Sequence, residues 1–286
     1  MKRTPIKVTA PTRDTDRLSQ LEGEDSPRKS LAKSVQAFYE IFPCGGDDAS
    51  DDNRWERLPW MKTEFGPDRH KGDRTLDLGC GTGIDALRFV RGDAALVGVD
   101  FACRPLALAR QRLGRRTPGG TFWLVRADAR RLPFKDNVFD YAYSDGVLHH
   151  IDGYDKALRE LQRCLKPAGS ATILMYHRWS LMTMLTLITR ACLRRERMRD
   201  WLLRRSASKS TTAGLAEVLE HPLSRFLSKA ELETVLVGSG FSVTAIRSYD
   251  WAFPLVRRSN RTEPSRLDGV GGRFLVARVE KVRPRE

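Results

Sequence analysis

The stretch "RTLDLGCGTGID", residues 74–85, places three glycines at alternate positions directly after a run that is typical of a buried strand. Glycine permits tight backbone angles and lets a ligand lie against bare peptide groups. The N–H groups at the start of a following helix favour a negatively charged moiety nearby. The G-x-G-x-G spacing differs from the G-x-G-x-x-G of dinucleotide sites. The stretch therefore predicts a strand-to-helix turn that holds a ligand against its backbone.

From residue 74 onward, strand-like and helix-like segments alternate along the chain. Their intervals suit βαβ units, in which parallel strands are joined by helices. Residues 166–169, Lys-Pro-Ala-Gly, predict a helix stop followed by a turn. The predicted strands are 75–80, 94–101, 121–128, 139–145, 170–177, 241–250 and 273–280, and the predicted helices are 30–42, 83–91, 103–114, 153–165 and 228–240.

Acidic residues lie in or at the ends of the first three predicted strands. Asp77 precedes the glycines, Asp100 ends the second strand and Asp128 ends the third. A carboxylate in the position of Asp100 can accept hydrogen bonds from ribose hydroxyls, and Asp128 can accept one from the exocyclic amine of adenine. Each acid by itself is more often a solvated loop residue or a helix cap. Three of them beside a glycine turn favour a nucleoside site.

The chain resembles the class I S-adenosylmethionine-dependent methyltransferases, in particular the large branch that acts mainly on small molecules. The resemblance rests on "TLDLGCGTG", "VGVDF", "RADARRLPFKDNVFDYAYSDGVLHHI" and "LRELQRCLKPAGSATILMYHR", and it is dense over residues 74–177. It implies an α/β, Rossmann-like fold with a seven-stranded, mostly parallel sheet in the order 3-2-1-4-5-7-6. Helices would cover both faces, and a helical lid would be inserted.

The resemblance also implies an enzyme whose cofactor is S-adenosyl-L-methionine. By position in the motifs, Asp77, Gly79 and Gly81 would surround the methionine part of that cofactor. Ser144, after the fourth strand, would lie near the sulfonium and the amino-acid end.

The nucleoside part of the cofactor would meet a second set of residues. Asp100 would hold the ribose hydroxyls, and Phe101 would flank the adenine. Asp128 and Ala129 would meet the edge of the base. The chain departs from the family at Ala168, where the "K-P-G-G" turn usually has glycine. Because that turn is structural, we expect little consequence.

Methyl transfer requires a nucleophile held in line behind the activated methyl group, with water excluded. A base is needed only if the nucleophile carries a proton that must leave. Because the position of His150 commonly faces the active site in the family, His150 is a catalytic candidate. Tyr176 and His177 end the fifth strand, where alternation sends one of them toward the cleft. For His150 the alternative is helix capping or packing, and for Tyr176 and His177 it is a role in shaping the pocket.

Three aromatic residues precede the glycine turn, in a region where related enzymes often have a helix that closes over the cofactor. We expect at least one of Tyr39, Trp55 and Trp60 to line the substrate cavity. A role in the hydrophobic core is the alternative for all three.

The order of segments predicts five parts. Residues 1–29 form a mobile arm, 30–73 a helical cap, 74–177 the cofactor-binding core, 178–222 a basic helical insertion, and 223–286 the rest of the sheet. Residues 178–209 contain nine basic and two acidic residues, and residues 257–286 contain nine basic and four acidic ones. With Leu181, Met184, Leu185, Ile188 and Cys192 on one helical face, the insertion could form a lid over a partly apolar, anionic substrate. A membrane-surface contact, a homodimer contact or a packed helix with solvated arginines are the alternatives.

These observations favour methyl transfer to a small or medium-sized acceptor, such as a natural-product or sugar-derived intermediate. The formal net charge of +14 keeps nucleic acid open as a substrate, although no nucleic-acid-binding motif is legible. A peptide substrate and a non-catalytic, cofactor-binding partner protein are further alternatives. Five widely spaced cysteines and an N-terminus without an apolar core predict a cytoplasmic protein. No metal and no transmembrane segment are predicted.

Overall fold

The computed structural model describes residues 27–43, 55–56, 58–180, 183–184, 187, 221–249 and 271–282. The predictions for residues 1–26 and for most of the basic insertion fall outside these ranges.

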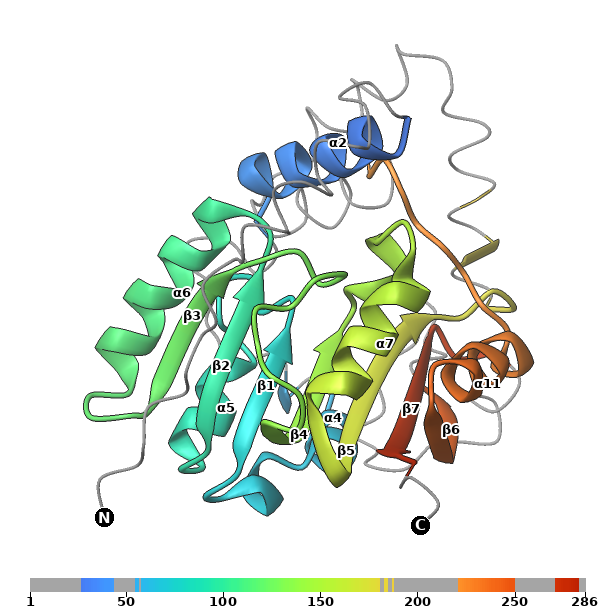
Figure 1. Ribbon diagram of the computed structural model, residues 1–286. Coiled ribbons are helices and arrows are strands. Elements are labelled where there is room, and N and C mark those ends of the chain that lie inside the picture. Colours follow the sequence, from blue (N-terminus) through green and yellow to red (C-terminus); the bar gives the residue numbers. More distant parts are fainter. Residues whose placement is uncertain are drawn as a thin grey trace.

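A seven-stranded sheet forms the centre of the molecule, with the strand order β3-β2-β1-β4-β5-β7-β6 (Figure 1). Neighbouring strands run parallel up to β5, and β7 runs antiparallel to both β5 and β6. The predicted fold and strand order are therefore confirmed. The strands are β1 Arg74–Leu78, β2 Ala95–Asp100, β3 Phe122–Arg126, β4 Phe139–Asp145, β5 Leu165–Tyr176, β6 Phe241–Tyr249 and β7 Phe274–Lys281.

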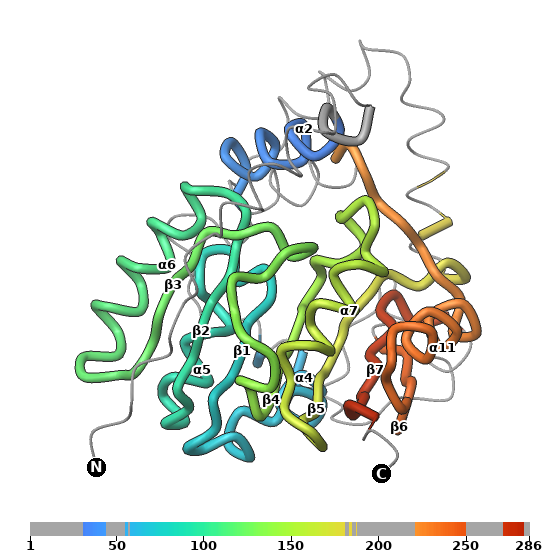
Figure 2. The backbone as a smooth tube through the Cα atoms, in the orientation of Figure 1, coloured from blue at the N-terminus to red at the C-terminus, as the bar shows by residue number. Residues whose placement is uncertain are grey.

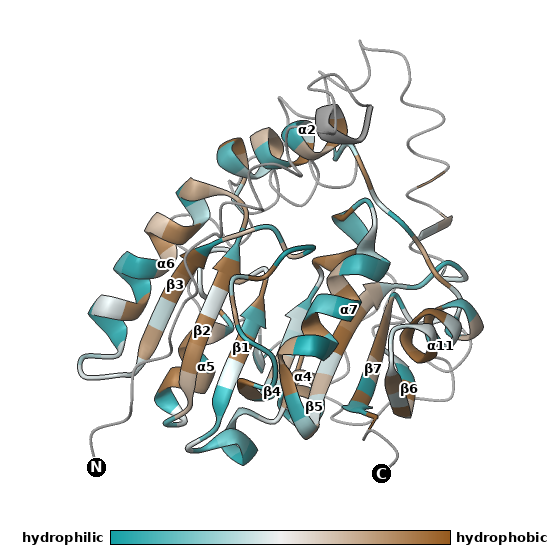
Figure 3. Cartoon of the chain, in the orientation of Figure 1, coloured by the Kyte–Doolittle hydropathy of each residue, from teal (hydrophilic) through white to brown (hydrophobic). Residues whose placement is uncertain are grey.

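Helices bury two hydrophobic clusters against the sheet. One cluster joins the sheet to α7 and α11 through Leu158, Leu161 and Leu232, and the other includes Phe65 of α4 and Phe89 of α5. Both hydrophilic (teal) and hydrophobic (brown) residues appear along α7 in Figure 3, as expected of a helix with one face on the core. The helices are α2 Pro27–Ile41, α4 Trp60–Phe65, α5 Ala86–Arg91, α6 Cys103–Arg116, α7 Tyr154–Cys164 and α11 Lys229–Gly238, with short 3-10 helices η1 Pro67–His70 and η2 Leu148–His150.

Helix α2 lies across the carboxyl end of the parallel strands (Figures 1 and 2). Its Glu40 carboxylate accepts hydrogen bonds from the backbone N–H groups of Cys103 and Arg104, at 2.7 and 2.9 Å. These N–H groups belong to the first turn of α6, which has no intrahelical partner for them. The bond from Cys103 is the main reason that the pKa of Glu40 is lowered. Glu40 therefore fastens α2 to the start of α6.

Two element boundaries differ from the sequence prediction for reasons of backbone conformation. Helix α5 begins at Ala86 and not at Gly83, because Gly81 and Gly83 have φ values of +50° and +76°, which no right-handed helix contains. Strand β5 begins at Leu165, so the predicted turn at 166–169 lies inside the strand as an irregularity. There Ala168 has a φ of +62°, a left-handed conformation that is costly for a residue with a Cβ.

The first residues of the insertion also correct the predicted helical face. Thr183, which is not among the residues predicted for the apolar face, is buried, and its hydroxyl donates to the His177 carbonyl oxygen at 2.7 Å. Met184 is 52% exposed, although the pattern places it on the apolar face. The hydroxyl finds its partner at the end of β5, and this local bond decides which side faces inward. In the described part of the chain, no helix has the length and apolar character needed to cross a bilayer.

Candidate active site

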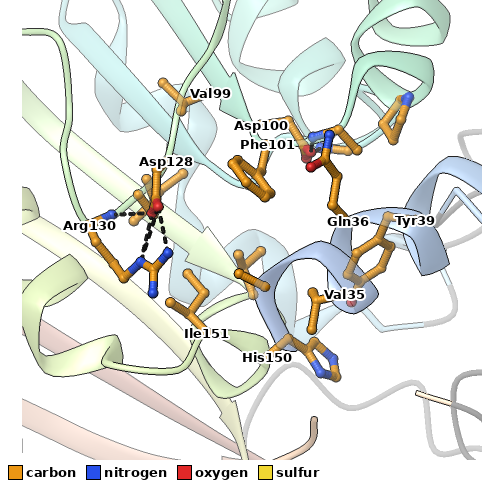
Figure 4. Close-up of a pocket in the computed structure, with 18 of the residues that line it drawn as sticks. Val35, Gln36, Tyr39, Val99, Asp100, Phe101, Asp128, Arg130, His150 and Ile151 are labelled. Atoms are coloured by element: carbon orange, nitrogen blue, oxygen red, sulfur yellow. Dashed lines mark hydrogen bonds and ion pairs between the residues drawn. The ribbon is translucent and has the colours of Figure 1, made fainter. Parts of the chain in front are cut away.

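A cavity opens at the carboxyl ends of β1 to β4, beneath α2 (Figure 4). This is the edge at which open α/β sheets bind their ligands. In Figure 4, Asp100 and Phe101 lie between the Asp128–Arg130 pair and the α2 residues, and His150 lies at another end, near Val35.

The glycine turn forms the floor of this cavity. Gly79 and Gly81 both line it. Gly79 has a φ of +83°, and a Cβ there would lie 2.3 Å from a methyl carbon of Val147. Only glycine fits this position, because any other residue would need a positive φ and its Cβ would collide with Val147. The turn is held open by hydrogen bonds from Gly79 N and Cys80 N to the Val99 carbonyl oxygen, at 2.7 and 2.9 Å.

Asp100 lines the cavity at the end of β2. One carboxylate oxygen accepts from Gly81 N at 2.9 Å, and the other accepts from Ala102 N at 2.9 Å. Burial raises the pKa of Asp100, and these backbone N–H groups oppose the shift. A carboxylate has about four lone-pair directions, so two remain for the hydroxyls of a ligand. Phe101 follows directly and lines the cavity, and the residue is 37% exposed.

Asp128 and Ala129 line the cavity beyond β3, and Asp128 is paired with a residue that the sequence analysis missed. Arg130 Nε and Nη2 donate to the two oxygens of Asp128, the latter at 2.7 Å, and Arg130 Nη1 donates to the Asp152 carbonyl oxygen at 3.1 Å. A basic residue two positions after an acid is a visible signal. Its pairing geometry depends on the turn after β3, which the pattern alone does not give.

Asp77 lies behind the glycine turn and does not line the cavity. It is 3% exposed, and it accepts a hydrogen bond from the Tyr143 hydroxyl at 2.7 Å. Burial raises the pKa of Asp77 well above its ordinary value, and the carboxylates of Asp85, Asp145 and Asp100 raise it further. The turn is thus surrounded by acidic groups. Such surroundings favour a ligand with positive charge at this end of the cavity.

Ser144 is fully buried in β4, and its hydroxyl has no hydrogen-bond partner within the described residues. It does not line the cavity, whereas its neighbours Asp145, Gly146 and Val147 do. Because successive side chains in a strand point to opposite faces, the cavity meets β4 at its last residue, Asp145, and not at Ser144.

Of the three catalytic candidates, His150 lines the cavity, and Tyr176 and His177 do not. The His177 ring donates from Nδ1 to the Gly272 carbonyl oxygen at 2.9 Å, and burial lowers the pKa of the ring. The Tyr176 ring packs against His149, with centroids 4.0 Å apart, and against Phe226. The structure therefore gives these two residues contacts that join β5 to its neighbours.

His150 belongs to a row of three histidine rings. Its centroid lies 4.0 Å from that of His149 and 3.8 Å from that of His221. His149 is fully buried, and neither of its ring nitrogens has a hydrogen-bond partner in the described structure. Burial lowers the pKa of His149 well below its ordinary value, and the neighbouring His150 and His221 lower it further. Among the described residues, no group has the arrangement of ligands that would hold a metal ion.

The aromatic residues before the turn divide between two places. Tyr39 lines the cavity from α2. Trp55 is 1% exposed and donates from Nε1 to Asp85 at 2.6 Å, and Trp60 stacks on Tyr249 with centroids 4.6 Å apart. Both tryptophans lie in the hydrophobic cluster that includes α4 and α5 and do not line this cavity.

The strand order, the antiparallel β7 and a cavity edged by acidic strand ends define the fold of class I S-adenosylmethionine-dependent methyltransferases. Residues 76–173 match the family described as "Methyltransferase domain". Over these residues the chain is therefore similar to the methyltransferase domains of class I, a class whose cofactor is S-adenosylmethionine.

Relatives and solved structures agree with this class. The chain is 41% identical over 110 residues to a 2-phytyl-1,4-naphtoquinone methyltransferase of Nostoc punctiforme, covering 37% of this chain and 48% of that protein. It is 35% identical over 118 residues to a demethylmenaquinone methyltransferase of Lactiplantibacillus plantarum, covering 40% and 48% of the two chains. These matches span about half the length of the relatives.

A solved structure extends the likeness in fold over most of the chain. A 1,6-didemethyltoxoflavin-N1-methyltransferase of Burkholderia thailandensis, with bound S-adenosylhomocysteine, has a TM-score of 0.57 and 17% identity, and the match covers 92% of this chain and 93% of that one. At this level of identity, the likeness concerns the fold.

Proposed function

We propose that the protein transfers a methyl group from S-adenosylmethionine to a small or medium-sized acceptor. The observation that carries this proposal is the charge and chemistry of the cavity edge. Carboxylates surround the glycine turn, including Asp100 at the end of β2, and Asp128 follows β3. A ligand with a cationic amino-acid end and a nucleoside matches both parts.

The residues present fit that cofactor. Asp100 would accept from the ribose hydroxyls, Phe101 would lie against the base, and Asp128 would accept from the adenine amine. The acidic residues around the turn, Asp77 and Asp145 among them, would offset the positive charge at the other end. When bound, the cofactor supplies a methyl group that is already activated by its sulfonium. The protein then has to bind and orient the acceptor, exclude water and take any proton that leaves.

The acceptor would bind at the end of the cavity that is formed by Tyr39, His150 and Leu223. The similarity to two quinone methyltransferases supports a small organic acceptor. A natural-product intermediate belongs to this class, and so does a sugar-derived or anionic one. The homodimer, the cytoplasmic location and the role of the basic insertion stay predictions from the sequence.

Two rival functions can be separated from this one by experiment. The basic residues of 178–209 are the reason to consider RNA or a peptide as the acceptor. A non-catalytic partner protein would bind the cofactor without transferring its methyl group.

The test begins with calorimetric titration of the purified protein with S-adenosylmethionine and S-adenosylhomocysteine. Transfer of a radiolabelled methyl group is then measured on separate panels of phenols and quinols, sugars, peptides and RNA. We expect uptake of both cofactor forms and label only in a small-molecule panel. Lack of uptake by folded protein would overturn the proposal, and label only in RNA or peptide would establish a rival.

A further inference from the structure

The carboxylate of Asp128 accepts hydrogen bonds from several donors of Arg130 at once. Its Oδ1 accepts from the Arg130 backbone N–H at 2.9 Å and from Nε at 3.0 Å. Its Oδ2 accepts from Nε at 3.1 Å and from Nη2 at 2.7 Å. A carboxylate offers about four lone-pair directions, so these three donors leave about one direction for a ligand.

The guanidinium of Arg130 is itself fixed by a contact on its other edge. Its Nη1 donates to the Asp152 carbonyl oxygen at 3.1 Å. Asp152 lies between η2 and α7, and its carboxylate is paired with Arg225 at 2.8 Å. A planar guanidinium that donates along two edges keeps one orientation, which a single point charge on a flexible stem does not. Arg130 therefore fixes the Asp128 carboxylate against a separate part of the chain.

The Asp128–Arg130 pair is held in place and is still accessible to a ligand. Both residues line the cavity, and the side chains of Asp128 and Arg130 are 33% and 27% exposed. In Figure 4 the Arg130 guanidinium lies on one side of the Asp128 carboxylate, and Phe101 lies in another direction from it. A surface acid without such a partner would lose rotational freedom on binding a ligand. Asp128 has lost that freedom before a ligand arrives.

Stability of the fold gives no sufficient reason for this pair. The two residues are two positions apart, so the ion pair between them joins no distant elements. Partly exposed ion pairs also contribute little to the free energy of unfolding. A fixed acceptor at the wall of a cavity does serve binding, because a ligand site needs side chains that are already oriented.

We propose that Arg130 is a positioning residue that orients the Asp128 carboxylate toward the amino group of the cofactor's base. The inference rests on the function proposed above, in which Asp128 accepts from the adenine amine. One N–H of that amine needs one lone-pair direction, which is what the donors of Arg130 leave. Arg130 acts through Asp128 and takes no part in the chemistry of methyl transfer. The affinity gained from the amino group therefore depends on Arg130.

The test compares S-adenosylhomocysteine with its 6-deamino analogue, in which hydrogen replaces the amino group of the base. Calorimetric titration gives the ratio of the two affinities, here called the amino preference. We expect the wild-type protein to bind S-adenosylhomocysteine about tenfold more tightly, as one charge-assisted hydrogen bond allows. Arg130→Gln should lower the amino preference to about twofold, because the carboxylate then has to be ordered by the ligand.

A merely structural role of Arg130 predicts a different result. Arg130→Gln would then weaken both ligands by the same factor and leave the amino preference unchanged, which would overturn the inference. A larger amino preference in Arg130→Gln would also overturn it, since Arg130 would then compete with the amine for Asp128.

The variant Arg130→Lys separates the charge of the side chain from its geometry. Lysine keeps the positive charge and lacks the planar fork that reaches both carboxylate oxygens and Asp152. We expect the amino preference of Arg130→Lys to stay close to that of Arg130→Gln. A preference equal to that of the wild type would show that charge alone suffices and would contradict positioning.

A double-mutant cycle shows whether Arg130 acts through Asp128. Asp128→Ala should abolish the amino preference, and the addition of Arg130→Gln should then leave the ratio unchanged. A further change in the ratio would refute action through Asp128. The matched control is Arg159→Gln, at an arginine that pairs with Asp155 on α7 and does not line the cavity. It should leave both affinities unchanged.

Failure of the inference differs from failure of the proposed function. Folded wild-type protein that binds neither ligand would overturn the proposed function, and the inference with it. Normal binding of S-adenosylhomocysteine, with an amino preference that is the same in Arg130→Gln, would refute the inference alone.

Discussion

The two ends of the cavity are built over very different distances along the chain. At the nucleoside end, the Gly81 N–H and the Asp100 carboxylate that it contacts are 19 positions apart, and Asp128 and Arg130 are two positions apart. At the histidine end, His150 meets the Leu223 carbonyl oxygen across 73 positions. The first end follows from a local motif. The second exists only after the chain has returned from the basic insertion.

The two ends also differ in charge. Carboxylates dominate the surroundings of the glycine turn, whereas the row of histidines includes a ring whose burial keeps it neutral. An acidic end suits a charged cofactor, and a neutral end suits an apolar acceptor. Substitutions at the two ends should therefore change the affinities for different ligands.

The largest expected effect concerns Asp100. Replacing it with asparagine removes the charge and half of its acceptor capacity while keeping its shape. We expect the affinity for S-adenosylmethionine to fall about 100-fold, which is the scale of charged hydrogen bonds to two hydroxyls. Calorimetry measures the change. Glu233→Gln, at an exposed acid on α11, is the matched control, and an unchanged affinity in Asp100→Asn would contradict the ribose role.

The next effect is a pH dependence of cofactor binding. The pKa values of Asp77 and Asp100 are raised by burial, so these groups take up protons at a higher pH than ordinary aspartates do. Protonation removes negative charge that attracts a cation. We expect the affinity for S-adenosylmethionine to fall about tenfold between pH 8 and pH 5, which is about one pKa unit of differential interaction.

Two comparisons sharpen that measurement. S-adenosylhomocysteine lacks the sulfonium charge, so its affinity should vary less with pH. Asp77→Asn should flatten the curve for the charged cofactor. Equal pH curves for the two cofactor forms would show that the acidic surroundings do not act through charge.

A smaller effect is expected at His149, on the stability of the protein. His149→Phe keeps an aromatic ring beside Tyr176 and removes two buried nitrogens without hydrogen-bond partners in the described structure. We expect the free energy of unfolding to rise by about 1 kcal/mol at pH 8, measured by urea denaturation.

The gain from His149→Phe should increase as the pH falls. The pKa of His149 is lowered in the folded protein, so below about pH 6.5 the unfolded chain binds more protons and the wild type loses stability. The phenylalanine variant escapes this loss. A destabilised variant, or a gain that is independent of pH, would contradict the assignment of a neutral, unsatisfied ring.

The smallest effect is expected at Ala168, remote from both ends of the cavity. Its φ of +62° suits glycine, although glycine also adds freedom to the unfolded chain. Ala168→Gly should raise the free energy of unfolding by about 0.5 kcal/mol and leave cofactor affinity unchanged. A loss of stability would show that the alanine methyl has packing that outweighs the backbone strain.

The fold could be predicted from sequence because its signals are local and repeated. Alternating strands and helices predicted βαβ units, and the resemblance to a known family implied the sheet order that the structure confirms. The boundaries that were wrong, at α5 and β5, depend on residues with positive φ. Their conformations are set by the packing around them, which a pattern of residue types does not contain.

The candidate site could be predicted only where a side chain follows directly from a strand end. Asp100, Phe101 and Asp128 lie on the cavity for this reason. The pairing of Arg130 with Asp128 depends on turn geometry, and the contact between His150 and His221 depends on tertiary packing. Trp55 and Trp60 precede the glycine turn in sequence, but α4 carries their part of the chain to the cluster that includes α5.

The carboxylate of Glu40 has a consequence for the entry and exit of ligands at the cavity. Because it binds the first N–H groups of α6, helix α2 is joined to the helix that begins two residues after Phe101. Moving α2 away from the cavity would remove the cap from the start of α6, at a cost of about 1 kcal/mol. A single acidic side chain thus ties the helix that covers the cavity to the end of β2.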